Sequence, residues 1–152
     1  MRSTRMAFLI KNFILTSAAA LMIFSFEPCA AQANFLNSAI IPAARGSVKV
    51  TKDKYNNYVL KIDLANMAEA SRLTPPKNTY VIWMVTADNA IKNIGQVRTI
   101  TSIFSKKLSA YFETKSSFKP VKIFITAEYD PNIQAPGEVV VLTTANFDLP
   151  KK

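Results

Sequence analysis

The fold of this chain is decided by residues 79–95, which read TYVIWMVTADNAIKNIG. A long apolar run that carries the only tryptophan, Trp83, leads into a polar turn at Asp88 and Asn89 and then reverses. β-Branched and aromatic residues favour a buried strand, and Asp and Asn favour the turn that ends it. The stretch therefore predicts a central β-hairpin, with Trp83 at the packing centre of the fold and Gly95 where a bulge or a close backbone approach excludes a side chain.

Short strands are predicted on both sides of this hairpin. Apolar residues alternate with polar ones, turn sequences separate the alternating runs, and no long segment has a helical period. The expected strands are residues 47–51, 58–64, 80–86, 91–99, 107–114, 121–127 and 138–144. The pattern predicts an all-β fold, an antiparallel seven-stranded immunoglobulin-like β-sandwich without a disulfide. A connection at residues 65–77, with one helical turn at 68–73, is expected to cross between the sheets.

The first 33 residues have the organisation of a secretory signal peptide. Three basic residues precede an uncharged apolar block, and an A-x-A cleavage pattern follows it. These features lie at Arg2, Arg5, Lys11, residues 13–26, and Ala31 with Ala33. The block has 14 residues, fewer than the roughly 20 that span a membrane as a helix. We therefore expect residues 1–33 to direct export and to be removed, so that membrane contact is transient and the protein is periplasmic or secreted.

Removal of the leader decides which chemistry the mature chain retains. The leader contains the only cysteine, Cys29, and the chain has no histidine. Ser-His-Asp and Cys-His catalysis and the common zinc and copper ligand sets are therefore excluded. We expect residues 34–46 to be a loosely held lead-in and residues 47–149 to form one β-sandwich domain. No catalytic, cofactor-binding or metal site is expected, and the protein is expected not to be an enzyme.

The chain is strongly basic, with 19 Lys and Arg against 10 Asp and Glu and a net charge of +9. The basic residues are scattered singly or in pairs, whereas nucleic-acid binding needs a clustered basic surface. The expected partner is therefore a protein or a component of the cell envelope, and not nucleic acid. The oligomeric state stays open. An apolar edge strand offers one route to a partner, by strand addition.

One pair of carboxylates keeps an enzymatic alternative open. Glu128 and Asp130 lie two residues apart at a strand end, as acid–base chemistry on an envelope polymer would require. With Asn132 they also resemble part of a calcium loop, but the glycine and the closing glutamate of such a loop are missing. Met67 and Met84 are interpreted as core residues and not as copper ligands.

Two segments resemble the extracytoplasmic C-terminal domain of anti-sigma-K factors. In the first, a proline-containing connection leads to a Tyr-x-x-Trp strand, an Asp-containing turn and a small apolar residue before Gly. In the second, a Phe-x-x-Thr-x-Glu strand is followed by a Pro-Gly loop and a valine-rich strand. The matching positions are Pro75, Tyr80, Trp83, Asp88, Ile94 and Gly95, then Phe124, Thr126, Glu128, Pro136, Gly137 and residues 139–142.

The resemblance implies a β-sandwich with a sensing or interaction role. That family usually has a Gly-Gly pair in the loop between the last two strands, where this chain has Asn132 and Ile133. An exported domain cannot hold a cytoplasmic sigma factor, so sigma inhibition is not expected. We therefore expect a non-catalytic exported interaction or sensing module that lacks the family's sigma-binding domain. The alternative is a carboxylate-based hydrolase or lyase acting on cell-envelope polymers.

Overall fold

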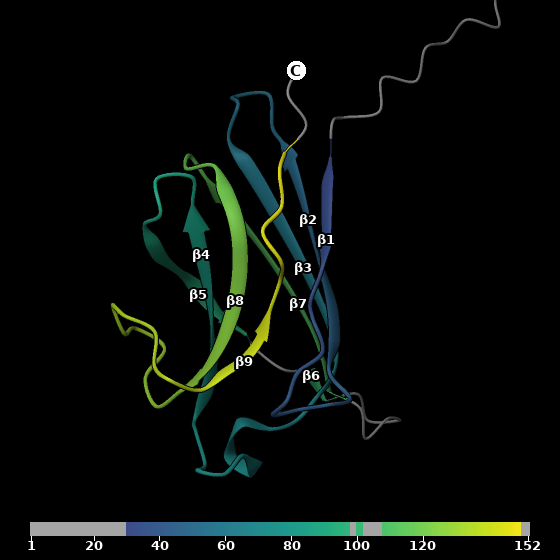
Figure 1. Ribbon diagram of the computed structural model, residues 1–152, viewed down its shortest axis with the longest axis vertical. Helices are drawn as coiled ribbons and strands as arrows, with labels where there is room; N and C mark the ends of the chain where they lie inside the picture. The colour runs from purple at the N-terminus through teal and green to yellow at the C-terminus, as the bar shows by residue number, and fades with distance from the viewer. Residues whose placement is uncertain (1–29, 98–99, 102–107, 150–152) are drawn as a thin grey trace, which may run out of the picture.

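Two antiparallel sheets form the structure, a computed structural model that describes residues 30–97, 100–101 and 108–149 (Figure 1). The first sheet has the strand order β1-β2-β3-β7-β6 and the second has the order β5-β4-β8-β9. The strands of the first sheet are β1 (Ala31–Asn34), β2 (Arg45–Lys52), β3 (Tyr58–Met67), β6 (Ile100–Thr101) and β7 (Leu108–Ser116). Those of the second are β4 (Thr79–Thr86), β5 (Ile91–Val97), β8 (Pro120–Glu128) and β9 (Val140–Thr143).

The sheets pack face to face across one hydrophobic core, so the prediction of an all-β, two-layered antiparallel fold is confirmed. Nine strands occur among the described residues, where the sequence predicted seven. The additional strands are β1, whose small residues give no hydrophobic alternation, and β6, which is only two residues long. Residues 1–29, 98–99 and 107, which the sequence placed in the leader and in two strands, lie outside the described residues.

Turn chemistry forms the β2–β3 hairpin as expected. The Asp53 carboxylate accepts hydrogen bonds from the backbone N–H groups of Tyr55 at 2.9 Å and Asn57 at 3.0 Å. Asn56 adopts a φ of 66° in the left-handed region, which Asn tolerates better than most residues. These contacts set the register that buries Val48, Val50, Leu60 and Ile62 on one face.

The connection after β3 crosses to the second sheet and contains the expected short helical turn, a 3₁₀ helix at Ala70–Arg72. Tyr80 of β4 holds the backbone of this connection, because the Tyr80 hydroxyl donates to the carbonyl of Ala68 at 2.9 Å. Among the described residues, no helix has the length and apolar character needed to cross a membrane.

The face of β4 that lies between the sheets is not the one that carries Trp83. Tyr80, Ile82 and Met84 point into the core between the sheets, whereas Trp83 is fully buried but lies outside that core. Because side chains alternate along a strand, Trp83 is on the outer face of the second sheet. The expectation that Trp83 is the packing centre between the sheets is therefore wrong. The run is apolar on both sides, so alternation alone did not assign its faces.

Residues 34–46 are not the loosely held lead-in that the sequence suggested. Phe35, Ile41 and Ala44 are buried members of the core. Phe35 donates its N–H to the carbonyl of Gly46 at 3.0 Å, and Leu36 donates to the carbonyl of Thr143 at 2.8 Å. The segment therefore joins the edge of the first sheet to β9 of the second. The expected boundary between residues 33 and 34 falls inside β1.

Replacing Phe35 by Ala should lower the free energy of unfolding by about 3 kcal/mol, because it removes a buried aromatic ring from the core. Leu36→Ala is the matched control, since Leu36 is 52% exposed and should change stability by less than about 0.5 kcal/mol. Urea unfolding followed by tryptophan fluorescence measures both. Equal, small effects would show that the segment is not part of the core.

Stability should fall as the pH rises from about 10 to about 12 through the ionisation of Tyr80. Burial raises the pKa of Tyr80 from 10.0 to about 12. The folded protein therefore keeps the phenolic proton where the unfolded chain loses it. The resulting contribution is complete below pH 10 and is lost as the pH rises through about 12. Urea unfolding across this range should show a shallower decline for Tyr80→Phe than for the wild type. Identical declines would contradict the assignment.

Candidate functional site: a groove along the edge strand β5

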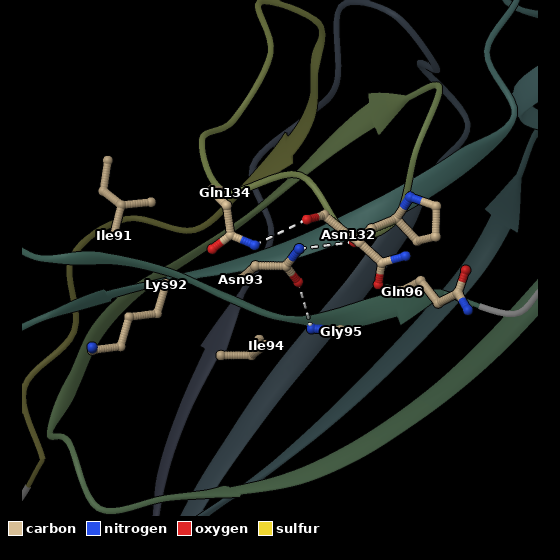
Figure 2. A pocket seen from close by; sticks show the side chains of 9 residues that line it. Ile91, Lys92, Asn93, Ile94, Gly95, Gln96, Asn132 and Gln134 are labelled. Atoms are coloured by element: carbon tan, nitrogen blue, oxygen red, sulfur yellow. Dashed lines mark hydrogen bonds between the residues drawn. The ribbon is translucent and has the colours of Figure 1, made fainter.

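A cavity of about 740 Å³ runs along β5, which is an edge strand of the second sheet. Six consecutive residues of β5, 91–96, line it on one side. Consecutive side chains of a strand point to opposite faces, and contact with all six residues is what a cavity along the free edge of the strand would show. Figure 2 shows the opposite wall, which comes from the loop between β8 and β9 through Pro131, Asn132 and Gln134.

The hairpin that presents this edge is built by turn and bulge residues. Asn89 closes the β4–β5 turn with a φ of 62°, and its N–H donates to the carbonyl of Thr86 at 2.9 Å. The register then shifts between Ile82 and Trp83, which leaves one extra residue in β5. Gly95 has a φ of +142°, and a Cβ there would lie 2.7 Å from the Phe112 ring. The bulge expected at Gly95 is confirmed.

Asn93 fastens the opposite wall to the strand. Its Nδ2 donates to the carbonyls of Pro131 at 2.9 Å and Ile133 at 3.0 Å, and its Oδ1 accepts from the N–H of Gly95 at 3.0 Å. Figure 2 shows this amide between β5 and the loop. One side chain thus joins two segments far apart in the sequence and also stabilises the bulge. All of the hydrogen-bonding atoms of this amide group are used within the protein.

Hydrogen bonds within the β8–β9 loop and at its base also fix its conformation. The Gln134 Nε2 donates to the carbonyl of Asn132 at 3.0 Å, and the Asp130 carboxylate accepts from the N–H of Asn132 at 2.8 Å. At the base, the Glu128 carboxylate accepts from the N–H of Gly137 at 2.7 Å. The wall is therefore preorganised, which reduces the entropic cost of binding a ligand against it.

The groove is polar, with a single ionisable side chain among its lining residues. That residue is Lys92, whose ammonium lies over the Phe118 ring, 4.1 Å from the ring centroid. Within the part of the chain that the structure describes, no carboxylate and no aromatic ring lines the groove. The remaining polar lining is amide: Asn93, Gln96, Asn132 and Gln134. Such a surface suits a ligand that offers both donors and acceptors and carries no positive charge.

The carboxylates singled out in the sequence have structural partners outside this groove. Glu128 is buried at 5% exposure and holds the loop through Gly137, while Asp130 is exposed and caps the turn at Asn132. Neither of them lines the cavity. Within the described residues, no group of three or more Asp, Glu, His or Cys side chains is arranged to hold a metal ion.

The remaining sequence candidates are core residues. Met67 and Met84 lie in the core between the sheets, and Trp83 has no exposed surface on which a ligand could stack. The Trp83 indole instead donates to the Thr126 hydroxyl at 2.8 Å and stacks on Phe124 with the ring centroids 6.2 Å apart. A smaller hollow of about 310 Å³ reaches Tyr80 beside the 3₁₀ helix.

Sequence reasoning did not identify the amides of the groove. Asn93 and Gln96 were assigned to a pairing strand, and Gln134 to an undifferentiated loop. Their meeting depends on the loop folding back over β5, and no local pattern encodes that contact. The one local signal was Gly95, which marked a backbone irregularity at this position.

No family model matches this chain. Searches of curated proteins and of solved structures likewise find no similar protein. The groove and its chemistry are thus the basis on which a function is proposed.

Replacing Asn93 by Asp should release the loop wall. Asp keeps the acceptor for the N–H of Gly95 but places an oxygen where Asn93 donates to two carbonyls. Losing two hydrogen bonds should lower the free energy of unfolding by about 2 kcal/mol. Amide hydrogen exchange at residues 129–137 should become faster.

Asn132→Asp is the control for the added charge, because Asn132 is exposed on the same groove. It should leave both stability and exchange close to those of the wild type. Unchanged exchange in Asn93→Asp would show that Asn93 does not hold the loop.

Proposed function

We propose that this protein is a non-catalytic exported interaction or sensing module, and that the groove along β5 is its binding site. The observation that carries the proposal is the composition of the groove, about 740 Å³ lined by amides and one ammonium. Convergent hydrogen-bonding groups in a preformed hollow are what a recognition site provides. Among the described lining residues Lys92 is the one ionisable group, whereas acid–base catalysis commonly uses a pair.

The proposed location is the periplasm or the exterior of the cell. Its support is the N-terminal sequence, in which basic residues precede a 14-residue apolar block and an A-x-A pattern follows it. Cleavage after Ala33 would remove most of β1, which is an edge strand of the first sheet. The core contacts of Phe35, Ile41 and Ala44 would remain in the mature chain.

The strand order supports an immunoglobulin-like topology as part of this proposal. Apart from β1 and β6, the seven other strands follow the orders β2-β3-β7 and β5-β4-β8-β9. Sandwiches of the fibronectin and immunoglobulin type divide seven strands between two sheets by similar crossings. The resemblance to the anti-sigma-K factor extracytoplasmic domain adds a sensing role to the proposal, with Tyr80, Trp83 and Gly95 as its structural residues.

A carboxylate-based hydrolase or lyase has less support as an alternative. Glu128 and Asp130 each accept a hydrogen bond from a backbone N–H of the loop. Their positions are explained by the need to shape the wall of the groove. Residues that hold a wall in place have a structural role whether or not a ligand is bound.

Site-specific photocrosslinking in intact cells tests the proposal. A benzoylphenylalanine at Gln134, in the groove, should give a defined adduct with a protein or polymer of the cell envelope. The same group at Tyr111, which is 52% exposed on β7 of the other sheet, should not give that adduct. The absence of adducts from Gln134 and from a second groove position, Gln96, would contradict the assignment of this groove as the binding site.

A further inference from the structure

The free edge of β5 has backbone groups that can pair with another strand. The N–H of Thr86 donates to the carbonyl of Ala90 at 3.0 Å, and the N–H of Ala90 donates to the Thr86 hydroxyl at 3.1 Å, so both backbone groups of Ala90 point toward β4. In an antiparallel pair of strands, bonded and non-bonded positions alternate. At the next position, Ile91 pairs with Val85, so its N–H and carbonyl point away from β4. Because β5 is an edge strand, they point toward the groove.

The groove has dimensions that fit an extended chain. Six residues of a strand extend about 20 Å, at about 3.3 Å per residue. The lining covers six residues of β5, and the loop wall with Asn132 and Gln134 lies opposite (Figure 2). A chain lying between them would pair with β5 on one side and meet side-chain amides on the other. The bulge at Gly95 interrupts regular pairing, so the amides of Gln96, Asn132 and Gln134 are needed beyond it.

The chemistry of the groove favours a polypeptide over a sugar chain. Side-chain amides match the alternating donors and acceptors of a peptide backbone. Sugar rings commonly stack on aromatic side chains, and the lining has none. The charge is complementary to an acidic segment, because Lys92 is the only ionisable residue in the lining and the whole chain has a net charge of +9.

We propose that the groove binds an extended acidic polypeptide segment, which adds as a strand to the free edge of β5 with an acidic side chain near Lys92. This inference rests on the proposed function and specifies its partner. The backbone of β5 supplies the affinity, and Lys92 with the loop amides supplies the selectivity, as in other cases of strand addition.

Synthetic peptides test the inference with the full chain. The probe is a ten-residue peptide of alternating Thr and Val that ends in two Glu residues, and binding is measured by calorimetry. One control peptide has Lys in place of Glu. The second control is a pair of peptides with N-methyl groups on alternate residues, one peptide for each hydrogen-bonding edge of the strand. The acidic peptide should bind at least about tenfold more tightly than both controls, a difference of about 1.4 kcal/mol. A neutral hexasaccharide should not bind.

Two variants at one position separate the backbone from the side chain. Ile91→Pro removes the outward N–H, a substitution that edge strands tolerate, and should weaken binding of the acidic peptide about tenfold. Ile91→Thr keeps the N–H and should bind the acidic peptide more tightly than Ile91→Pro does. Circular dichroism checks that both variants fold. If Ile91→Pro does not fold, the N-methylated peptides on the wild-type protein decide the same question.

Each negative result in these experiments contradicts a different claim. Equal binding of the N-methylated and unmodified peptides, or binding of the hexasaccharide in their place, would overturn strand addition. A lack of any peptide binding, together with an envelope adduct from the crosslinker at Gln134, would overturn this inference and leave the proposed function intact. A lack of both would contradict the two together.

Discussion

Burial of β4 on both faces is the constraint on which the rest of the structure depends. Tyr80, Ile82 and Met84 fill the space between the sheets, and Trp83 is equally buried on the opposite side. A strand that is apolar on both faces must be shielded from solvent on both sides. The first sheet shields one side, and the loop between β8 and β9 is held over the other side by Asn93 and Glu128. The same loop forms one wall of the groove along β5.

Polar groups beneath this loop are paired. The Trp83 indole N–H reaches the Thr126 hydroxyl, and the Glu128 carboxylate reaches the N–H of Gly137. No buried side-chain nitrogen or oxygen in the described part of the chain lacks a hydrogen-bond partner. An unpaired buried polar group costs about 1–3 kcal/mol, so the pairing of Glu128 with Gly137 makes the position of the loop specific. The same specificity gives the groove a fixed wall.

Local patterns predicted the elements of the fold well. Three of these elements depend on backbone conformations that a few residue types favour. They are the β2–β3 turn at residues 53–57, the hairpin at Asp88 and Asn89, and the bulge at Gly95. The alternation in β2 and β3 likewise predicted which residues are buried. These features are decided within a few residues of one another, and a sequence shows them directly.

Contacts between distant segments were not predicted. Alternation could not assign the faces of β4, because both of them are apolar. Residues 34–46 lack a repeating pattern, and their burial depends on contacts with the far end of the domain. The groove required Asn93 and the loop at Pro131 to meet, which only the complete fold achieves. The candidate site was thus the part of the molecule least accessible to sequence reasoning.

The bridge between Phe35 and Thr144 has a consequence for the order of folding. It joins the start of the domain to the residue that follows β9, so this pairing cannot form until the C-terminal end of the domain is available. Contacts of such long sequence separation slow folding, because the chain must close a large loop first. Under the proposed export, this delay would keep the polypeptide unfolded during its passage until the C-terminal end of the domain has crossed.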